Sequence, residues 1–228
     1  MSAKSMCDIS YSQGHELILA LEKAGFTGDT VQQVINSRGN KMAKAMYAVA
    51  TDGKQTDNRF QLLKSFDVTV PQGYDHATRL DTFRAAHQNE ENKEFYFYND
   101  AITDANFSKA TTKLVAGRQF TVKVFGITER VTSDDCLAKL RSEKAVLVGA
   151  QGASLAYEQK KAELPKGKWA ISFDEKKALW RDSRGRHGVP GVFANSDGDF
   201  GFDLGHFEDV WHSGYVLLCF CDKESSDA

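Results

Sequence analysis

The chain has 228 residues, of which 41% are hydrophobic and 26% charged, and its 29 Lys and Arg residues nearly balance 31 Asp and Glu residues. This composition is typical of a globular protein long enough to bury a core without a metal or a disulfide. The net charge of −2 gives no overall field to attract nucleic acid or an anionic membrane, and no run approaches the roughly 20 apolar residues of a membrane-spanning helix.

The first fifty residues show helical spacing of apolar side chains. Ser12 is placed to cap a helix over residues 13–24, and Asp29 or Thr30 to cap a second one. A third helical pattern follows a break at residues 37–40. Three short helices of this size can form a small bundle or dock on a neighbouring domain.

A polar segment separates these helices from the rest of the chain. Residues 51–58 contain no apolar side chain and therefore predict a linker or an exposed loop. We expect a helical module over residues 1–58 and a mixed α+β domain over residues 59–228.

Strands enter the pattern in this second domain. Alternating apolar and polar residues predict a strand over residues 66–70, and aromatic or β-branched residues predict two more, over residues 95–98 and 120–127. Between the first two strands, apolar residues at helical spacing predict a helix over residues 76–88.

The next segment predicts the start of a β-α-β-α-β unit. The strand at 120–127 leads to a helix over about residues 133–142, which Thr132 or Ser133 can cap. The apolar run at residues 145–148 then predicts a central strand that is covered on both faces.

A helix over residues 153–163 and a strand over residues 169–173 complete this unit. The helical connections are long enough for its strands to pair in parallel. Spacers with Gly and Asp then separate three short strands, as in antiparallel hairpins, over residues 189–194, 200–204 and 215–221. The predicted fold class is α+β: a small N-terminal helical module, then a mixed sheet with C-terminal hairpins.

The turn after the apolar run is where local geometry suggests chemistry. A strand, a glycine turn and a helix direct free backbone N–H groups at an anion. Gly149 and Gly152 would let a ligand approach the backbone, and Gln151 and Ser154 would donate hydrogen bonds. Asp174 follows Gly149 by 25 residues, near the spacing at which dinucleotide-binding units place an acidic residue on the ribose.

The same turn also has a structural interpretation. Its G-x-x-G pattern lacks the third glycine of the dinucleotide fingerprint and the lysine of a P-loop. In this alternative, glycine supplies a positive φ and Ser154 caps the helix. The residues of the turn, together with Asp174, are the candidate site for a phosphorylated small ligand.

Other patterns favour structural roles. The acidic residues of NSDGDFGFD lack the glycine and glutamate positions of a calcium loop. Cys219 and Cys221 stand in an apolar strand without the C-x₂-C pairs of zinc sites, and Cys136 shares an apolar stripe with leucines. We therefore assign no catalytic residue, no metal ligand and no cofactor.

A cluster of aromatic and basic residues has two interpretations. It could stack on bases or bind an acidic partner, or it could be a solvated hairpin tip. Its members are Trp180, Arg181, Arg184, Arg186 and His187.

The cellular compartment is predicted from the cysteines and the N-terminus. The four cysteines lie far apart except for Cys219 and Cys221, and the first residues have no apolar core of a secretory signal. Both features favour reduced thiols in a cytoplasm.

Three stretches, VLVGAQGASLAYEQ, ELPKGKWAISFDEKKALW and GYVLLCFCD, together resemble a group of uncharacterised bacterial proteins. The resemblance covers most of the chain after about Phe66. Because the group has no assigned activity, the resemblance implies a bacterial cytoplasmic protein and no catalytic residues.

The absence of a complete catalytic motif favours a binding or accessory protein that recognises a protein or a small ligand through the mixed-sheet domain. The first alternative is an enzyme or sensor that binds a phosphorylated ligand at the Gly149 turn. The second is nucleic-acid binding through the N-terminal helices, whose cations are Lys23, Arg38, Lys41 and Lys44. A membrane is not an expected partner.

Overall fold

A computed structural model describes residues 15, 18–19, 23, 27–36 and 57–223 of the chain. The chain divides into two compact units, Met1–Thr56 and Asp57–Ala228. Within the described residues, no helix is both long and apolar enough to cross a membrane.

In the first unit, the structure describes helix α2, Gly28–Asn36. The backbone N–H of Thr30 donates to Thr27 Oγ1 at 3.3 Å, and the backbone N–H of Thr27 donates to Thr30 Oγ1 at 2.6 Å. The predicted caps, Asp29 or Thr30, are therefore wrong, because the helix begins earlier and Thr27 precedes it.

The remaining predictions for this unit fall largely or wholly outside the described residues. They include most of the helix over residues 13–24 and the whole third helical pattern. Of the cations invoked for nucleic-acid binding, Arg38, Lys41 and Lys44 lie outside as well.

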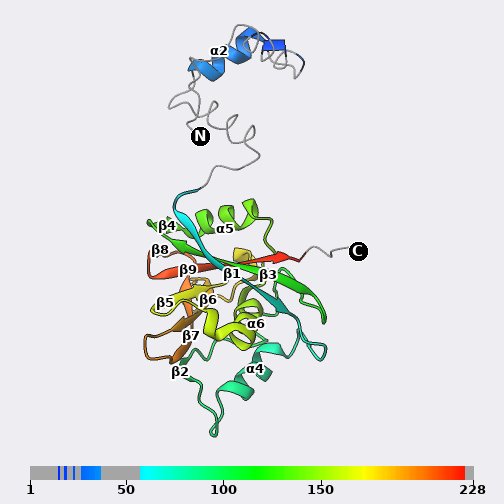
Figure 1. Ribbon diagram of the computed structural model, residues 1–228, viewed down its shortest axis with the longest axis vertical. Coiled ribbons are helices and arrows are strands. Elements are labelled where there is room, and N and C mark those ends of the chain that lie inside the picture. The colour runs from blue at the N-terminus through cyan, green and yellow to red at the C-terminus, as the bar shows by residue number, and fades with distance from the viewer. Residues whose placement is uncertain (1–14, 16–17, 20–22, 24–26, 37–56, 224–228) are drawn as a thin grey trace. The chain divides into compact units, whose positions relative to one another are not determined.

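Seven strands of the second unit form one mixed sheet in the order β1-β3-β9-β5-β6-β7-β2 (Figure 1). Their bounds are β1 Phe60–Thr69, β2 Phe95–Tyr98, β3 Gln119–Ile127, β5 Lys168–Ile171, β6 Gly188–Ala194, β7 Phe200–His206 and β9 Tyr215–Asp222. The β5–β9 and β2–β7 pairs are parallel, and the other neighbours in the sheet are antiparallel. Two short strands, β4 (Val131–Thr132) and β8 (Val210–Trp211), pair separately.

Helices cover both faces of this sheet. Helices α4 (Arg79–His87) and α6 (Gly149–Lys160) lie on one face, and α5 (Ser133–Ser142) lies on the other. The alternation of side chains along β9 separates the two cores, because Leu218 packs with the α4 and α6 side and Leu217 with the α5 side. The second unit also contains two short 3₁₀ helices, η3 (Lys161–Glu163) and η4 (Lys176–Ala178).

The apolar run at residues 145–148 is not a strand, contrary to the prediction. It makes a single bridge, in which the Val146 N–H donates to Phe220 O at 2.7 Å. One edge of β9 is occupied by β3, and β5 already pairs with residues 215–217 on the other edge. The run meets this second edge at Phe220, beyond the residues paired with β5, and the chain turns into α6 at Gly149 rather than at residue 153.

The predicted parallel β-α-β-α-β unit is also wrong. Strands β3 and β5 both flank β9, but β3 is antiparallel to it and β5 is parallel to it, so β3 and β5 run in opposite directions. Of the predicted C-terminal hairpins, β6–β7 is confirmed. Strand β9 pairs with neither of these two and enters the centre of the sheet instead.

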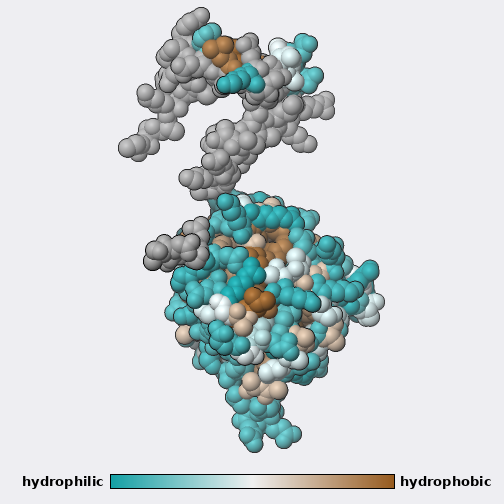
Figure 2. All heavy atoms as spheres, turned by 90° about the vertical axis from the view of Figure 1, so that its right-hand side faces the viewer, coloured by the Kyte–Doolittle hydropathy of each residue, from teal (hydrophilic) through white to brown (hydrophobic). Residues whose placement is uncertain are grey.

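The two edge strands expose large apolar side chains. Leu62 and Leu63 on β1 are 52% and 43% exposed, and Tyr96 and Phe97 on β2 are 60% and 45% exposed. Figure 2 shows a face of the molecule on which the second unit is mostly hydrophilic, with apolar side chains gathered in one area. Large apolar side chains thus remain uncovered where the sheet has no further strand.

Candidate functional site

The five residues predicted to bind a ligand lie inside the second unit. Gln151, Ser154 and Asp174 are 2%, 0% and 3% exposed, and the two glycines are buried as well. The N–H of Gly149 donates to Phe173 O at 3.2 Å, and that of Gly152 donates to Val148 O at 3.0 Å. These two donors are therefore used within the chain.

The backbone or the packing explains why glycine stands at both positions of the turn. Gly149 has a φ of +46°, in the region that favours glycine. A Cβ added to Gly152 would overlap the side chain of Val148 and lie 3.2 Å from Phe220. The prediction that Ser154 caps the helix is wrong, because Ser154 lies inside α6, where its hydroxyl donates to Gln151 O at 2.8 Å.

Asp174 joins two loops. Its Oδ2 accepts the Thr111 N–H at 3.0 Å, and its Oδ1 accepts the Glu175 N–H at 2.7 Å. Burial raises the pKa of this carboxyl group. Thr111 lies two residues after Lys109 and Glu175 two residues before Lys177, so Asp174 links the two segments that carry these lysines.

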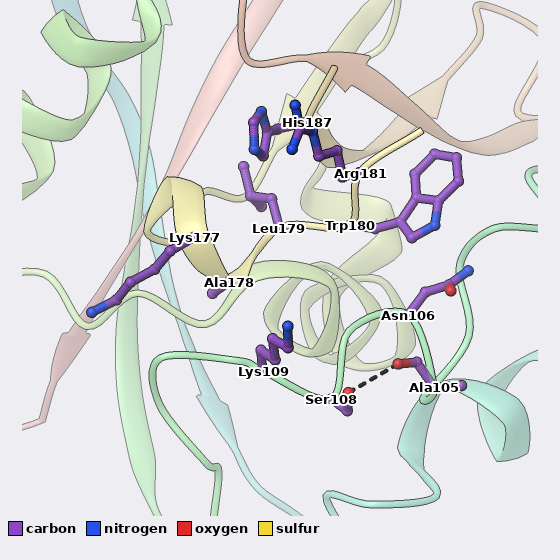
Figure 3. Close-up of a pocket in the computed structure, with 10 residues that line it drawn as sticks. All are labelled: Ala105, Asn106, Ser108, Lys109, Lys177, Ala178, Leu179, Trp180, Arg181 and His187. Carbon is purple, nitrogen blue, oxygen red and sulfur yellow. Dashed lines mark hydrogen bonds between the residues drawn. The ribbon is translucent and has the colours of Figure 1, made fainter. Parts of the chain in front are cut away.

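Those two segments line an open pocket with a volume of about 320 Å³ (Figure 3). Its lining residues come from the loop after β2, from η4 and the chain that follows it, and from the start of β6: Ala105, Asn106, Ser108, Lys109, Lys177, Ala178, Leu179, Trp180, Arg181 and His187. None of the five predicted residues is among them. Three of the ten are cationic and none is acidic.

The acidic side chains near this pocket bind partners other than its three lining cations. Glu208 accepts from His187 Nδ1 at 2.8 Å and pairs with Lys176 at 3.1 Å. Asp182 pairs with Arg186 at 2.9 Å. Within the part of the chain that the structure describes, the three lining cations form no ion pair, so the pocket carries uncompensated positive charge.

Figure 3 shows how the side chains are arranged. Lys109 points from one wall toward Leu179, and Arg181 and His187 lie together on the opposite wall, where their backbones form a bridge. The Nε of Arg181 donates to Gly185 O at 3.0 Å, which holds the guanidinium. Lys177 extends away from the others and belongs to the rim.

Local hydrogen bonds fix the loop that carries Lys109. Asp104 accepts the N–H groups of Leu80 and Asp81 at the start of α4, both at 2.9 Å. The Asn106 side chain donates to Ala101 O at 2.8 Å, and the Ser108 hydroxyl donates to Ala105 O at 2.9 Å. This wall of the pocket is therefore preformed.

Sequence reasoning found part of this pocket. The predicted aromatic and basic cluster supplies Trp180, Arg181 and His187. Lys109 and Lys177 were missed because an isolated lysine outside any recognised element gives no signal in the sequence. Their proximity follows from the link between Thr111 and Asp174, which are 63 residues apart.

A second pocket, of about 270 Å³, lies beside α4. Its walls include Tyr74, Arg79 and Glu158. Arg79 pairs with Glu158 at 2.9 Å and also donates to Ser154 Oγ at 3.1 Å. Because this cation is already paired, the second pocket is less suited to an anion.

The structure also describes Cys136 and the acidic turn, to which the sequence analysis assigned structural roles. Cys136 is buried in the core, which raises the pKa of its thiol to about 12. The Asn195 side chain bonds to Asp199 across the turn between β6 and β7. Among the described residues, no group of three or more His, Cys, Asp or Glu side chains could hold a metal ion.

A scan against protein-family models, a search of curated proteins and a search of solved structures each gave no match. The resemblance to uncharacterised bacterial proteins stays a prediction.

Proposed function

We propose that the protein is a binding protein for a small anionic ligand, which it holds in the pocket between residues 105–109 and 177–181. The observation that carries this proposal is the charge of the lining: three cations without ion pairs in the described chain, and no acid. An anion would relieve the repulsion among these cations and accept their hydrogen bonds.

The size of the pocket narrows the ligand class. Its volume of about 320 Å³ lies at the lower end of the roughly 300–1,000 Å³ of small-molecule sites. A phosphorylated or carboxylated metabolite the size of a sugar phosphate or a nucleoside monophosphate suits this space. Our proposal therefore moves the phosphorylated ligand considered for the α6 turn to this pocket, whose two walls are linked through Asp174.

The test is a titration of the full chain with inorganic phosphate, ribose 5-phosphate and adenosine 5′-monophosphate, followed by calorimetry. We expect at least one probe to bind, and the Lys109→Gln/Arg181→Gln variant to bind it at least tenfold more weakly. A tenfold loss corresponds to about 1.4 kcal/mol, a modest value for two charged contacts.

The matched control is the Lys166→Gln/Arg130→Gln variant. Both residues are exposed, neither lines the pocket, and neither has an ion pair among the described residues. The control removes the same charge and should keep the affinity. Equal losses in the two variants, or no binding of any probe to the unmodified chain, would refute the proposal.

A further inference from the structure

Cys219 and Cys221 bring two thiols together on one face of β9. Residues two apart on a strand share a face, and here the two Sγ atoms are 3.8 Å apart and not bonded. Both residues pair with β3, with Cys219 opposite Lys123 and Cys221 opposite Thr121. The sheet therefore fixes the backbone on which both sulfurs stand.

This geometry suits a shared metal ion better than a disulfide. A disulfide needs sulfurs about 2.05 Å apart and Cβ atoms about 3.5–4.5 Å apart, which a paired, extended strand opposes. Thiolates bind Zn²⁺ at about 2.3 Å. With that bond length, the 3.8 Å between the sulfurs corresponds to an S–metal–S angle of about 111°, close to tetrahedral.

The surroundings of the pair permit access from the side of Cys221. Cys219 is buried, but Cys221 is only partly buried, so an ion can reach the pair from solvent. The carbonyl oxygen of Glu143 lies 3.5 Å from Cys221 Sγ, and its carboxylate is held by Lys123 at 2.7 Å.

We propose that Cys219 and Cys221 form a two-thiolate site for a thiophilic divalent metal ion such as Zn²⁺. Binding forms two metal–sulfur bonds and releases the two thiol protons to solvent, with no change of oxidation state. Since no third His, Cys, Asp or Glu among the described residues completes a metal site, water fills the remaining positions. The site is independent of the proposed anion pocket.

The experiment is a titration of the reduced full chain with Cd²⁺, which gives thiolate-to-metal charge-transfer absorption in the ultraviolet. We expect the band to saturate at one ion per chain and to fall when Zn²⁺ is added as a competitor. The band should be lost in Cys219→Ser and in Cys221→Ser. It should persist in Cys7→Ser and Cys136→Ala, which remove the other two cysteines.

Circular dichroism of each variant confirms that it is folded. Cys221→Ala is a second substitution at the more exposed position and should lose the band as well. No band in the unmodified chain, or a band retained by both single serine variants, overturns the proposal.

Discussion

Gly152 has a different role from the one that its sequence pattern predicts. The G-x-x-G pattern predicts that the missing side chain lets a ligand approach the backbone. In the structure, neighbouring side chains occupy that space instead. A Cβ at this position would overlap the side chain of Val148, the residue before α6, and would lie 3.2 Å from Phe220 on β9. Glycine is therefore required for packing at the start of α6, against Val148 and the neighbouring strand β9.

This role leads to a stability prediction. Gly152→Ala should lower the free energy of unfolding by up to about 2 kcal/mol, because overpacking costs roughly 1–3 kcal/mol and replacing glycine in a helix gains about 1 kcal/mol. Urea denaturation measures the change. Gly73→Ala is the control, since nothing lies within 4 Å of a Cβ there. Equal stability of the two variants would contradict the packing role.

Asp174 shows how far a single residue could be predicted. Its spacing from Gly149 drew attention to it, and the structure places it next to that glycine, where an added Cβ would lie 3.3 Å from Asp174 Cβ. Its partners could not be predicted, because the Thr111 N–H comes from a loop without a recognisable pattern. The spacing in sequence predicted that Asp174 lies near Gly149. The role of Asp174 depends on its long-range contact with Thr111.

Among the elements, α5 was predicted accurately because its signals are local. Thr132 and Asp135 form a capping box: the Asp135 N–H donates to Thr132 Oγ1 at 3.2 Å, and the Thr132 N–H donates to Asp135 Oδ2 at 2.9 Å. Both residues are close in sequence, so the start of the helix can be predicted without the rest of the fold.

The contribution of this cap can be measured. Thr132→Ala removes the hydroxyl and leaves an N–H at the helix start without its acceptor, so the free energy of unfolding should fall by about 0.5–2 kcal/mol. Thr132→Ser keeps the hydroxyl and should lose less. Thermal and urea unfolding of the two variants give the comparison. A serine variant as unstable as the alanine variant would show that the methyl group, not the cap, matters.

The run at residues 145–148 shows why another element was mispredicted. Its side chains alternate between the two cores, with Val146 and Val148 on the α6 side and Ala145 and Leu147 on the α5 side. The contact with both cores was therefore predicted correctly, although only Val148 is fully buried and the other three residues are half-buried. An apolar pattern reports burial, however, and not which strand edge is available for pairing. That edge depends on β5 and β9, which come later in the chain.

In the whole molecule, the order of the sheet depends on its last strand. Strand β9 lies between β3 and β5, antiparallel to β3 and parallel to β5, so β3 and β5 run in opposite directions. No local periodicity encodes such a pairing. The α+β class could be predicted from the mixture of patterns, whereas the strand order and the pocket formed by distant loops could not.

Glu94 connects several elements of the second unit through its carboxylate. It accepts from Tyr157 Oη on α6 at 2.7 Å, from Lys161 Nζ at 2.8 Å and from His87 Nδ1 on α4 at 3.1 Å. Burial acts to raise the pKa of Glu94, but these hydrogen bonds outweigh it and lower the pKa to about 2. The folded protein therefore favours the ionised carboxylate more strongly than the unfolded chain does.

This pKa predicts how stability depends on pH. A glutamate that titrates near 4.5 when unfolded and near 2 when folded contributes stability above the unfolded value and loses it as the pH falls toward 2. Glu208, whose pKa is also lowered to about 2, acts in the same direction. Asp104 and Asp174 act in the opposite direction, because burial raises their pKa values and so penalises their ionised forms.

A comparison of variants isolates the contribution of Glu94 from these opposing groups. Glu94→Gln should be less stable than the unmodified chain at pH 7, and the difference should shrink as the pH falls from about 5 to 2, because the unmodified carboxylate becomes protonated in that range. Urea unfolding at a series of pH values measures the difference. Glu129→Gln is the control, since Glu129 is exposed and has no ion pair among the described residues. A difference for Glu94→Gln that stays constant down to pH 2 would mean that the network acts through neutral hydrogen bonds and packing rather than through the charge of Glu94.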